Sequence, residues 1–464
     1  MHRLTNWQGR LPVLFFLVVC LVPVGVAAQP ASSPGLQAEV DAYLKPYLDG
    51  HNFSGVVLIA REGKIVLHKG YGRANYELDV PNSPAIKFHL ASVSKPFTAA
   101  AILLLEERGL LSISDPVARF IPDYPNGGRI TLHHLLTHTS GIPNINDFPE
   151  YEQASKFPHT PAGLVALFKD KPLDFAPGER YRYSNSNYNL LAYIIEKVSG
   201  QSYGEFLSEN ILKPLGMTST GHHGDASALI ENKASGYAPV GAKGLENAPY
   251  LDWSSKTGNG SLYATAEDLN KFDRALYTDK LLSAASRAKM FAESGDRNSH
   301  GWFVRDRFGH RVTASNGRSP GFTSSLERFT DDDVCIIVLS NLYISTPIPA
   351  DLAAIVFGEA HTDPAEIQPV ALPPEALVLP VGRYQFGQDF FRPGINVTAH
   401  QEGEELLLDW SEGFASPLIP LSETRFLDRN FWAAVTFVTD EKGKVTKLLW
   451  RYEKDYAAER INEE

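Results

Sequence analysis

A serine hydroxyl and a lysine amine lie three residues apart, as Ser92 and Lys95, in the stretch HLASVSKPFTAAAILLLEERG. Residues at this spacing share one face of a helix, so the amine can reach the hydroxyl. Pro96 lacks a backbone N–H and is tolerated only in a first turn, which fixes the helix start close to Ser92. Unpaired N–H groups and the helix dipole there favour an alkoxide. The pair could therefore be a nucleophile and its base, although Ser286 and Lys289 have the same spacing and a helix cap beside a surface lysine is the simpler alternative.

A second candidate is Tyr183-Ser184-Asn185, which lies just before a segment with the apolar period of a helix. A phenol and a carboxamide two residues apart on an extended segment point to the same side. Beside a cation, the pKa of Tyr183 could fall below its usual value of about 10, and the phenol could shuttle protons. Asn185 could hold the lysine or a substrate amide. A packed tyrosine and a turn asparagine are the alternative, since Tyr124-Pro125-Asn126 has the same spacing in an evident loop.

Ser319 is a rival nucleophile, because Gly317-Arg318-Ser319-Pro320-Gly321 matches the G-x-S-x-G turn of α/β-hydrolases. That turn uses the backbone N–H of the residue after the serine, and Pro320 has none. The turn should also open a helix, whereas the following FTSSLERF alternates like a strand. Both points disfavour Ser319.

His134 and His138 have the i, i+4 spacing of some metal ligands. No glutamate accompanies them in an H-E-x-x-H arrangement, and no cysteine cluster supports them. The pattern favours a packed or capping pair, and we expect neither a metal nor an organic cofactor.

The segments around these motifs have the order of an α+β fold. Residues 37–50 have the pattern of an amphipathic helix, and two β-branched runs joined at Glu62-Gly63-Lys64 predict a hairpin. The helix of Ser92 ends near Gly109, and helical segments with Gly-, Pro- and Asn-rich loops continue to about residue 250. Strand patterns return in HGWFVRDRFGHRVTAS and FTSSLERFTDDDVCIIVLSN, before a closing helix in DLAAIVFGEA. The early and late strands are expected to share one antiparallel sheet.

The 464-residue length is typical of two or three domains. The first would cover residues 36–360 and carry the chemistry. A proline-rich stretch without period predicts a linker over residues 361–374. Strand-like segments separated by Gly-containing turns then predict a small antiparallel β domain over residues 375–464, either a sandwich or a barrel.

The N-terminus has the order of a secretory signal: Arg3 and Arg10, the apolar run LPVLFFLVVCLVPVGVAA, and small residues before Gln29. We predict a signal peptide over residues 1–28 and a secreted or periplasmic bacterial protein. An uncleaved anchor is the alternative. Pro12 and Pro23 leave too short a stretch for a bilayer, which takes about 20 residues, so no stable membrane span is expected after cleavage.

Composition indicates a soluble globular protein, with 43% hydrophobic and 21% charged residues. Cleavage would remove two arginines and no acid, taking the net charge from -11 to -13. Without a polybasic tract, this charge argues against nucleic acid or an anionic membrane as a partner. Only Cys335 would remain, in the apolar run VCIIVLS, so we expect a buried thiol and no internal disulfide.

Together the motifs resemble the serine β-lactamase-like hydrolases, which include class C β-lactamases, D-alanyl-D-alanine carboxypeptidases, D-aminopeptidases and some esterases. The resemblance covers about residues 38–357 and rests on these stretches in order: SVSKPFTA, ISDPVARFIPDYP, ITLHHLLTHTSGIP, FAPGERYRYSNSNYNLL, LKPLGMTST, GSLYATAEDLNKF and NGRSPGF. It implies an antiparallel sheet flanked by helices, with a helical subdomain. The C-terminal β domain resembles the small barrel modules that some members carry.

The resemblance also implies roles for individual residues. Ser92 would be the acylated nucleophile, and Lys95 and Tyr183 would share the general base and acid work. Asn185 would bind Lys95 or the substrate amide.

The family's third motif, Lys or His, any residue, then Gly, stands here as Ser315-Asn316-Gly317. The resemblance implies that Gly317 allows close approach and that the Arg318 N–H is the second oxyanion donor. Ser315 departs from the pattern, and a neutral hydroxyl holds a substrate carboxylate more weakly than a charged group does. Arg318 or Arg311 could restore the missing charge.

These features predict an exported serine hydrolase that forms an acyl-enzyme on small-molecule or peptide-like substrates. Ser315 shifts the expectation from a β-lactamase or strict carboxypeptidase towards an esterase or a D-amino-acid peptidase. The alternative from another class is a non-catalytic binding or regulatory protein that uses the same cleft. The sequence leaves the natural substrate, the role of the β domain and the oligomeric state open.

Overall fold

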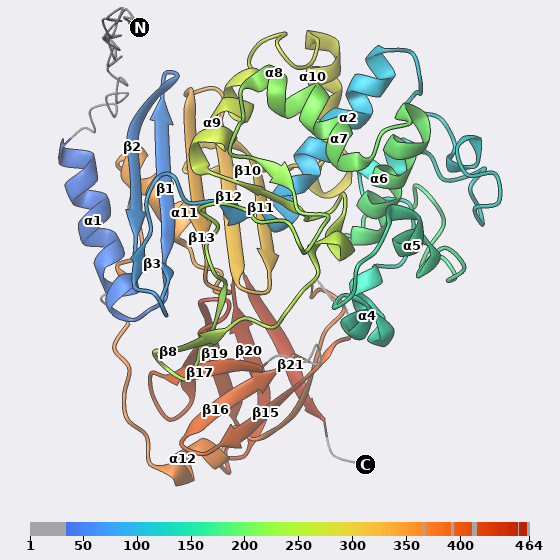
Figure 1. Ribbon diagram of the computed structural model, residues 1–464. Helices are drawn as coiled ribbons and strands as arrows, with labels where there is room; N and C mark the ends of the chain where they lie inside the picture. The colour runs from blue at the N-terminus through green and yellow to red at the C-terminus, as the bar shows by residue number, and fades with distance from the viewer. Residues whose placement is uncertain (1–33, 365–366, 391–393, 411–414, 453, 462–464) are drawn as a thin grey trace, which may run out of the picture.

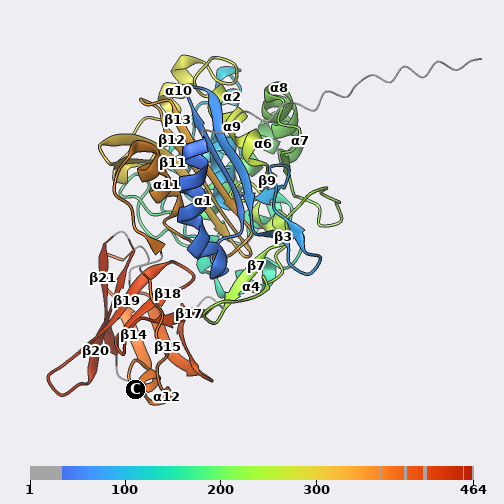
Figure 2. The same cartoon turned by 90° about the vertical axis from the view of Figure 1, so that its left-hand side faces the viewer.

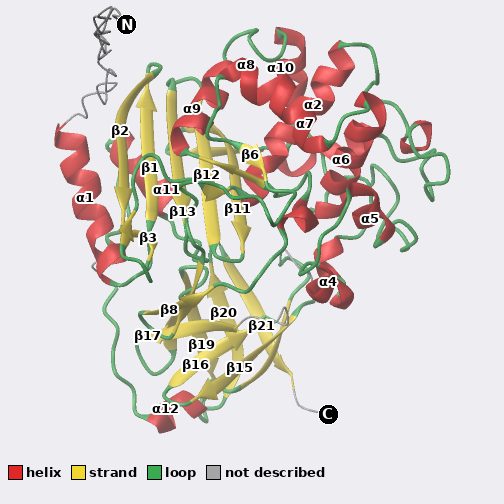
Figure 3. Ribbon diagram, viewed as in Figure 1, coloured by secondary structure: helices red, strands yellow, loops and turns green. Residues whose placement is uncertain are grey.

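The computed structural model describes residues 34–364, 367–390, 394–410, 415–452 and 454–461 (Figure 1). The predicted signal peptide over residues 1–28 lies outside the described residues. The described chain forms a helix-covered sheet with a helical layer beside it, and a barrel below (Figures 1 and 3). The α+β class predicted from the sequence is confirmed.

The central sheet is antiparallel, with six strands in the order β10-β11-β12-β13-β1-β2. The strands are β10 (Phe303–Arg307), β11 (His310–Ser319), β12 (Phe322–Phe329), β13 (Val334–Ser340), β1 (Gly55–Arg61) and β2 (Lys64–Tyr71). The pairing of β1 with β13 joins the two ends of this region. The β1–β2 hairpin turns at Glu62 and Gly63, whose φ angles of 50° and 72° suit the right-handed twist of the strands.

Alternate residues of β1 enter two different cores, as the period of a strand requires. Val56 and Leu58 pack with the helical layer, which contains α2 (Lys95–Glu107), α6 (Asn185–Ser199) and α9 (Ala266–Ala275). Val57 and Ile59 pack on the opposite face against α1 (Pro34–Asp49) and α11 (Ile348–Phe357). Figure 2 shows α1 and α11 over this face. Cys335 on β13 is buried, as its apolar neighbours predicted.

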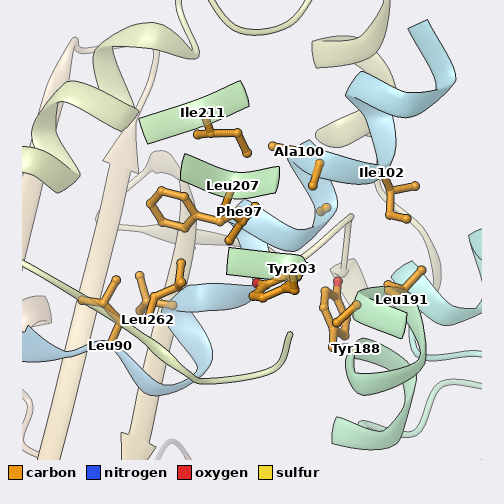
Figure 4. Packing of buried hydrophobic residues seen from close by; sticks show 14 of the residues in the cluster. Leu90, Phe97, Ala100, Ile102, Tyr188, Leu191, Tyr203, Leu207, Ile211 and Leu262 are labelled. Atoms are coloured by element: carbon orange, nitrogen blue, oxygen red, sulfur yellow. The ribbon is translucent and has the colours of Figure 1, made fainter. Parts of the chain in front are cut away.

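The helical layer surrounds α2, which carries Lys95. Aromatic and aliphatic side chains from α2, α6 and α7 (Tyr203–Leu207) meet there, including Phe97, Tyr188 and Tyr203 (Figure 4). The layer also contains α3 (Leu132–Leu136), α4 (Pro149–Ala154), α5 (Pro161–Ala166), α8 (Lys213–Leu215) and α10 (Ala284–Met290). Because this packing buries nearly all of α2, the helix is a rigid support for the residues at its start.

The C-terminal β region is a closed antiparallel barrel and not a sandwich. Its strands are β14 (Gly382–Phe386), β15 (Asn396–Glu402), β16 (Glu405–Asp409), β17 (Ala415–Pro420), β18 (Arg425–Asp428), β19 (Ala433–Thr439), β20 (Val445–Arg451) and β21 (Asp455–Ile461). Pairing of β14 with β21 closes it. A short helix, α12 (Pro374–Val378), precedes β14.

The fully buried Arg429 joins the barrel to the rest of the protein. Its guanidinium donates to Asn52 Oδ1 at 2.8 Å and to the carbonyl of His51 at 3.1 Å. It also donates to the carbonyls of Val240 and Gly244, at 3.0 and 2.9 Å, in the hairpin of β7 (Tyr237–Val240) and β8 (Gly244–Asn247). Charge-assisted bonds to several segments fix the orientation of the barrel.

Candidate active site

Ser92 lies in a 3₁₀ turn, Ala91–Ser94, that leads directly into α2. Pro96 is the second residue of α2, so the prediction that it marks the helix start holds, with Ser92 one short turn further ahead. Ala91 has a positive φ of 46° although it has a side chain, and it is buried. Such strained residues persist where the surrounding structure holds them, often beside functional groups.

The structure brings Ser92, Lys95 and Tyr183 into hydrogen-bonding contact. Lys95 Nζ lies 2.9 Å from Ser92 Oγ, and Tyr183 OH lies 2.8 Å from the same oxygen. Asn185, the first residue of α6, accepts from Lys95 Nζ through Oδ1 at 2.9 Å. The backbone carbonyl of Asn259 accepts from the same nitrogen at 2.9 Å. These distances allow proton transfer within the cluster.

Burial lowers the pKa of Lys95 well below its usual value, and the nearby positive charge of Lys256 lowers it further. A neutral amine has two N–H donors and one lone pair. The Asn259 carbonyl and Asn185 Oδ1 can only accept, so they take both donors. In its neutral form, the amine therefore has its lone pair left for the Ser92 hydroxyl, which is the arrangement of a base with its nucleophile.

The prediction that a neighbouring cation lowers the Tyr183 pKa is wrong. Burial of the phenol raises the pKa of Tyr183 to about 12, and its hydrogen bond with Ser92 offsets only part of this rise. The phenol therefore stays protonated at neutral pH and acts as a hydrogen-bond donor to Ser92 Oγ. The family resemblance placed Tyr183 beside Ser92, but no sequence pattern gave its burial.

The two histidines of the HHLLTHTSG stretch have structural roles. His134 forms a capping box with Thr131 at the start of α3. His138 is buried, and its Nδ1 accepts from the backbone N–H of Ser184, next to Tyr183. Burial lowers the pKa of His138 to about 3, so it stays neutral. Its ring lies 4.6 Å from the ring of Tyr183 and supports it.

A loop that sequence reasoning did not single out holds Asn185. Asn144 Oδ1 accepts from the backbone N–H of Asn185 at 2.9 Å, and Asn146 Oδ1 accepts from its side-chain Nδ2 at 2.8 Å. The second bond turns the Asn185 oxygen towards Lys95. The loop SGIPNINDF was recognisable only as a polar connection, because it has no period or known motif.

The edge of β11 approaches the turn of Ser92. A Cβ on Gly317 would lie 2.2 Å from the Leu90 carbonyl and 2.8 Å from the Ser92 nitrogen, so only glycine fits here. Ser319 and Phe322 close the β11–β12 hairpin, with Arg318 opposite Thr323. In a hairpin closed by Ser319 and Phe322, the N–H groups of β11 point alternately towards and away from β12, and that of Arg318 points away from it.

Ser315 is only 2% exposed and lines a small cavity of about 10 Å³ together with Ser92, Lys95 and Tyr183. A space of that size holds one water molecule. Asn316 borders both this cavity and the main cleft. Ser315 is thus beside the cluster of Ser92, Lys95 and Tyr183, and its neighbour Asn316 also borders the open cleft.

The two arginines considered as substitutes for the missing cation differ in position. Arg318 borders the cleft, and its guanidinium lies over the rings of Tyr343 and Phe431, at 3.7 and 4.3 Å. Arg311 donates to Glu293 at the surface, and it is not among the residues that line the cleft. The structure therefore offers Arg318 and not Arg311 for this role. Ser319 closes a β-hairpin instead of opening a helix, which removes the nucleophile elbow.

The site opens into a cleft of about 2170 Å³ that the barrel helps to enclose. Its barrel-side residues include Gln388, Phe390, Glu402, Glu405, Pro417 and Asn430. Among the described residues, no group of three or more His, Cys, Asp or Glu side chains is placed to hold a metal ion. Within the same residues, no helix is long and apolar enough to cross a membrane.

This fold, with a serine, a lysine and a tyrosine at the sheet edge, is that of the β-lactamases and penicillin-binding proteins. The Beta-lactamase family model matches residues 40–357. Penicillin-binding protein 4* of Bacillus subtilis is 32% identical over 428 residues, which cover 86% of this chain and 93% of that protein. The chain therefore belongs to the Beta-lactamase family, whose members are serine hydrolases.

Solved structures show the same fold. The octameric penicillin-binding protein homologue from Pyrococcus abyssi is 24% identical with a TM-score of 0.63, and the match covers 91% of this chain and 100% of that one. The D-stereospecific amidohydrolase from a Streptomyces species is 25% identical with a TM-score of 0.56, covering 65% of this chain and 94% of that one. The first match extends over most of the chain, whereas the second covers about two thirds of it.

Proposed function

We propose that this protein hydrolyses ester or amide bonds through an acyl-enzyme on Ser92. The observation that carries the proposal is the contact of Ser92 Oγ with both Lys95 Nζ and Tyr183 OH at the mouth of a large cleft. Uncharged Lys95 can accept the proton of the Ser92 hydroxyl, and the protonated Tyr183 phenol donates a hydrogen bond that stabilises the resulting alkoxide. Ser92 is thereby activated as a nucleophile.

In the first half-reaction Lys95 takes the proton of Ser92 while Ser92 Oγ bonds to the substrate carbonyl carbon. The backbone N–H groups of Ser92 and Arg318 stabilise the oxyanion. The proton returns through Lys95 and Tyr183 to the leaving oxygen or nitrogen as its bond to carbon breaks. Water then repeats the sequence on the acyl-enzyme, releases the acid and restores Ser92.

The substrates we propose are esters and amides of small or peptide-like acids, including those of D-amino acids. Two features support this choice. Ser315 leaves the strand position without the cation that the family commonly has there. The similar protein from a Streptomyces species is a D-stereospecific amidohydrolase. We also propose that residues 1–28 export the protein, and that residues 36–360, 361–374 and 375–464 are its catalytic domain, linker and barrel domain.

An acylation assay tests the proposal. The protein is treated with a fluorophosphonate and with a penicillin, and its intact mass is measured. We expect one adduct, which Ser92→Ala abolishes. Ser319→Ala is the matched control and should keep it. Absence of any adduct, together with no turnover of p-nitrophenyl esters, would instead support a binding or regulatory protein.

Rates on a substrate panel then define the chemistry. The panel holds a p-nitrophenyl ester, a D-amino-acid amide, a D-Ala-D-Ala peptide and nitrocefin. We expect the ester and the D-amino-acid amide to be hydrolysed faster than nitrocefin. The opposite order would contradict the proposed substrate class.

A further inference from the structure

Lys256 is a buried cation beside the active site that the proposed mechanism does not use. It ends a short 3₁₀ turn, Trp253–Lys256, and is 7% exposed. Its carbonyl accepts from the backbone N–H groups of Asn259 and Gly260, at 3.0 and 2.8 Å. Asn259 in turn accepts from Lys95, so the segment that carries Lys256 is tied to the catalytic amine.

The ammonium of Lys256 has an aromatic contact but no anion. Its Nζ lies 5.0 Å from the centre of the Tyr151 ring, which a hydrogen bond from Tyr151 OH to the Ser255 carbonyl holds in place. Among the residues that the structure describes, no carboxylate pairs with this ammonium and no oxygen accepts from it. A cation–π contact compensates only part of the cost of removing an ammonium from water.

Two of the acidic residues that line the cleft have other cations as partners. Asp147 lies 3.8 Å from Arg182, and Glu152 lies 3.6 Å from Lys156. Lys256 lines the same cleft as these acids and as Ser92. It is also close enough to Lys95 for its charge to lower the pKa of that amine. An anion that enters the cleft to react at Ser92 would therefore pass within reach of Lys256.

We propose that Lys256 binds a carboxylate of the substrate and thereby selects anionic esters or amides over neutral ones. The inference rests on the proposed hydrolase function. It adds a cation on the turn before β9 (Leu262–Ala264), separate from Arg318 on β11, the strand on which Ser315 stands. A carboxylate supplies acceptors for the three N–H bonds of the ammonium and neutralises a partly desolvated charge.

Three esters test this selection: phenyl butyrate, 3-carboxyphenyl butyrate and monophenyl adipate. They carry no carboxylate, a carboxylate on the leaving group, and a carboxylate on the acyl group. Rates are compared at a pH on the plateau of each variant's own pH profile, which removes any effect of Lys256 on the Lys95 pKa. Lys256→Met keeps the length of the side chain, and Lys256→Arg keeps the charge.

We expect Lys256→Met to lower kcat/KM for at least one carboxylate ester about 10- to 100-fold, mainly through KM, as loss of a charged hydrogen bond predicts. Phenyl butyrate should stay within about threefold of the wild type, and Lys256→Arg should recover part of the selectivity. Lys156→Met is the matched control, since Lys156 lines the same cleft but has Glu152 as partner; it should change none of the three rates. An equal loss on all three esters, or no loss on either carboxylate ester, would overturn the proposal.

A binding measurement separates this inference from the hydrolase function. Monophenyl adipate and phenyl butyrate are titrated calorimetrically into Ser92→Ala protein with and without Lys256→Met. Stronger binding of the adipate that disappears with Lys256→Met supports the carboxylate site even if Ser92 is never acylated. Equal affinities for the adipate in both proteins, together with equal rates on all esters, would refute it.

Discussion

Replacing Gly317 by alanine tests whether the distance between β11 and the Ser92 turn controls acylation. The added Cβ would lie 2.2 Å from the Leu90 carbonyl and 2.6 Å from Ser324 Oγ. That carbonyl cannot simply rotate away, because it already accepts hydrogen bonds from Ser324 Oγ at 2.6 Å and from the Val93 N–H at 3.1 Å. Ordinary contact begins near 3.4 Å, so β11 and the turn must separate by about 1 Å.

A separation of this size has a predictable effect on the proposed oxyanion site. The Ser92 N–H is on the turn and the Arg318 N–H is on β11, so moving the two segments apart pulls one donor from the developing charge. A misplacement of about 1 Å, or the loss of one oxyanion donor, costs about 100-fold in rate, which is about 2.7 kcal/mol of transition-state stabilisation. Gly317 does not have a positive φ, so the effect is one of contact and not of backbone strain.

The assay is the rate of Ser92 labelling by a fluorophosphonate, with the thermal midpoint measured alongside. Gly128→Ala is the matched control, because a Cβ there meets nothing within 4 Å and the φ angle is not positive. We expect Gly317→Ala to label about 100-fold more slowly and to unfold at a somewhat lower temperature, as an overpacked contact costs about 1–3 kcal/mol. Labelling within threefold of the wild type in a folded Gly317→Ala protein would refute the reasoning about this edge.

Four further changes have definite expected outcomes. Arg429→Met removes the donors to several buried carbonyls and should lower the free energy of unfolding by about 3–5 kcal/mol, measured in urea; a change below about 1 kcal/mol would mean that the barrel junction does not depend on this guanidinium. Burial raises the pKa of Asp428 to about 6, so its stabilising contribution is full below its unfolded pKa near 3.8 and is lost as the pH rises through 6. Relative to Asp428→Asn, the wild type should therefore lose about 2.4 kcal/mol between pH 4 and 7.5, and a pH-independent difference would contradict the buried-acid assignment. Because the pKa of Lys95 is lowered, the labelling rate of Ser92 should rise with pH to a plateau well below pH 10.5, and Lys256→Met should move that rise to higher pH; an unchanged midpoint would show that the two amines do not interact. A chain ending near residue 365 should keep Ser92 labelling and lose solubility or substrate selectivity, whereas a folded truncation without labelling would show that the barrel builds the site.

The sequence predicted those features of the site that depend on local spacing. Ser92 and Lys95 could be paired because helical geometry and Pro96 fix their relation within one turn. The β1–β2 hairpin followed from two β-branched runs joined at Glu62-Gly63-Lys64, where Gly63 readily accepts the positive φ of a tight turn. Placing Tyr183 beside them needed the combined motifs of a family, because nothing in a 91-residue separation fixes a distance.

The sequence could not predict the properties that depend on packing between distant segments. The high pKa of Tyr183 comes from burial under residues such as His138, and no pattern near Tyr183 reveals it. Closure of the barrel, in contrast to a sandwich, depends on the pairing of residues 383–386 with 458–461 across the whole domain. No sequence pattern indicated a role for Lys256. Its burial and the lack of a paired carboxylate among the described residues are visible only in the folded structure.

The barrel contacts the side chain of Arg318, whereas the backbone N–H of Arg318, the proposed oxyanion donor, is held by the central sheet. The Arg318 guanidinium lies over Phe431 of the barrel, and its charge also acts on the buried Asp428. The Arg318 N–H, however, is positioned by the pairing of β11 with β12, where Arg318 lies opposite Thr323. Loss of the barrel would release the guanidinium and open one wall of the cleft while β12 still holds the N–H in place. We therefore expect the barrel to affect which substrates fit and how their charges are bound, while the central sheet and α2 together hold the groups proposed to form the acyl-enzyme.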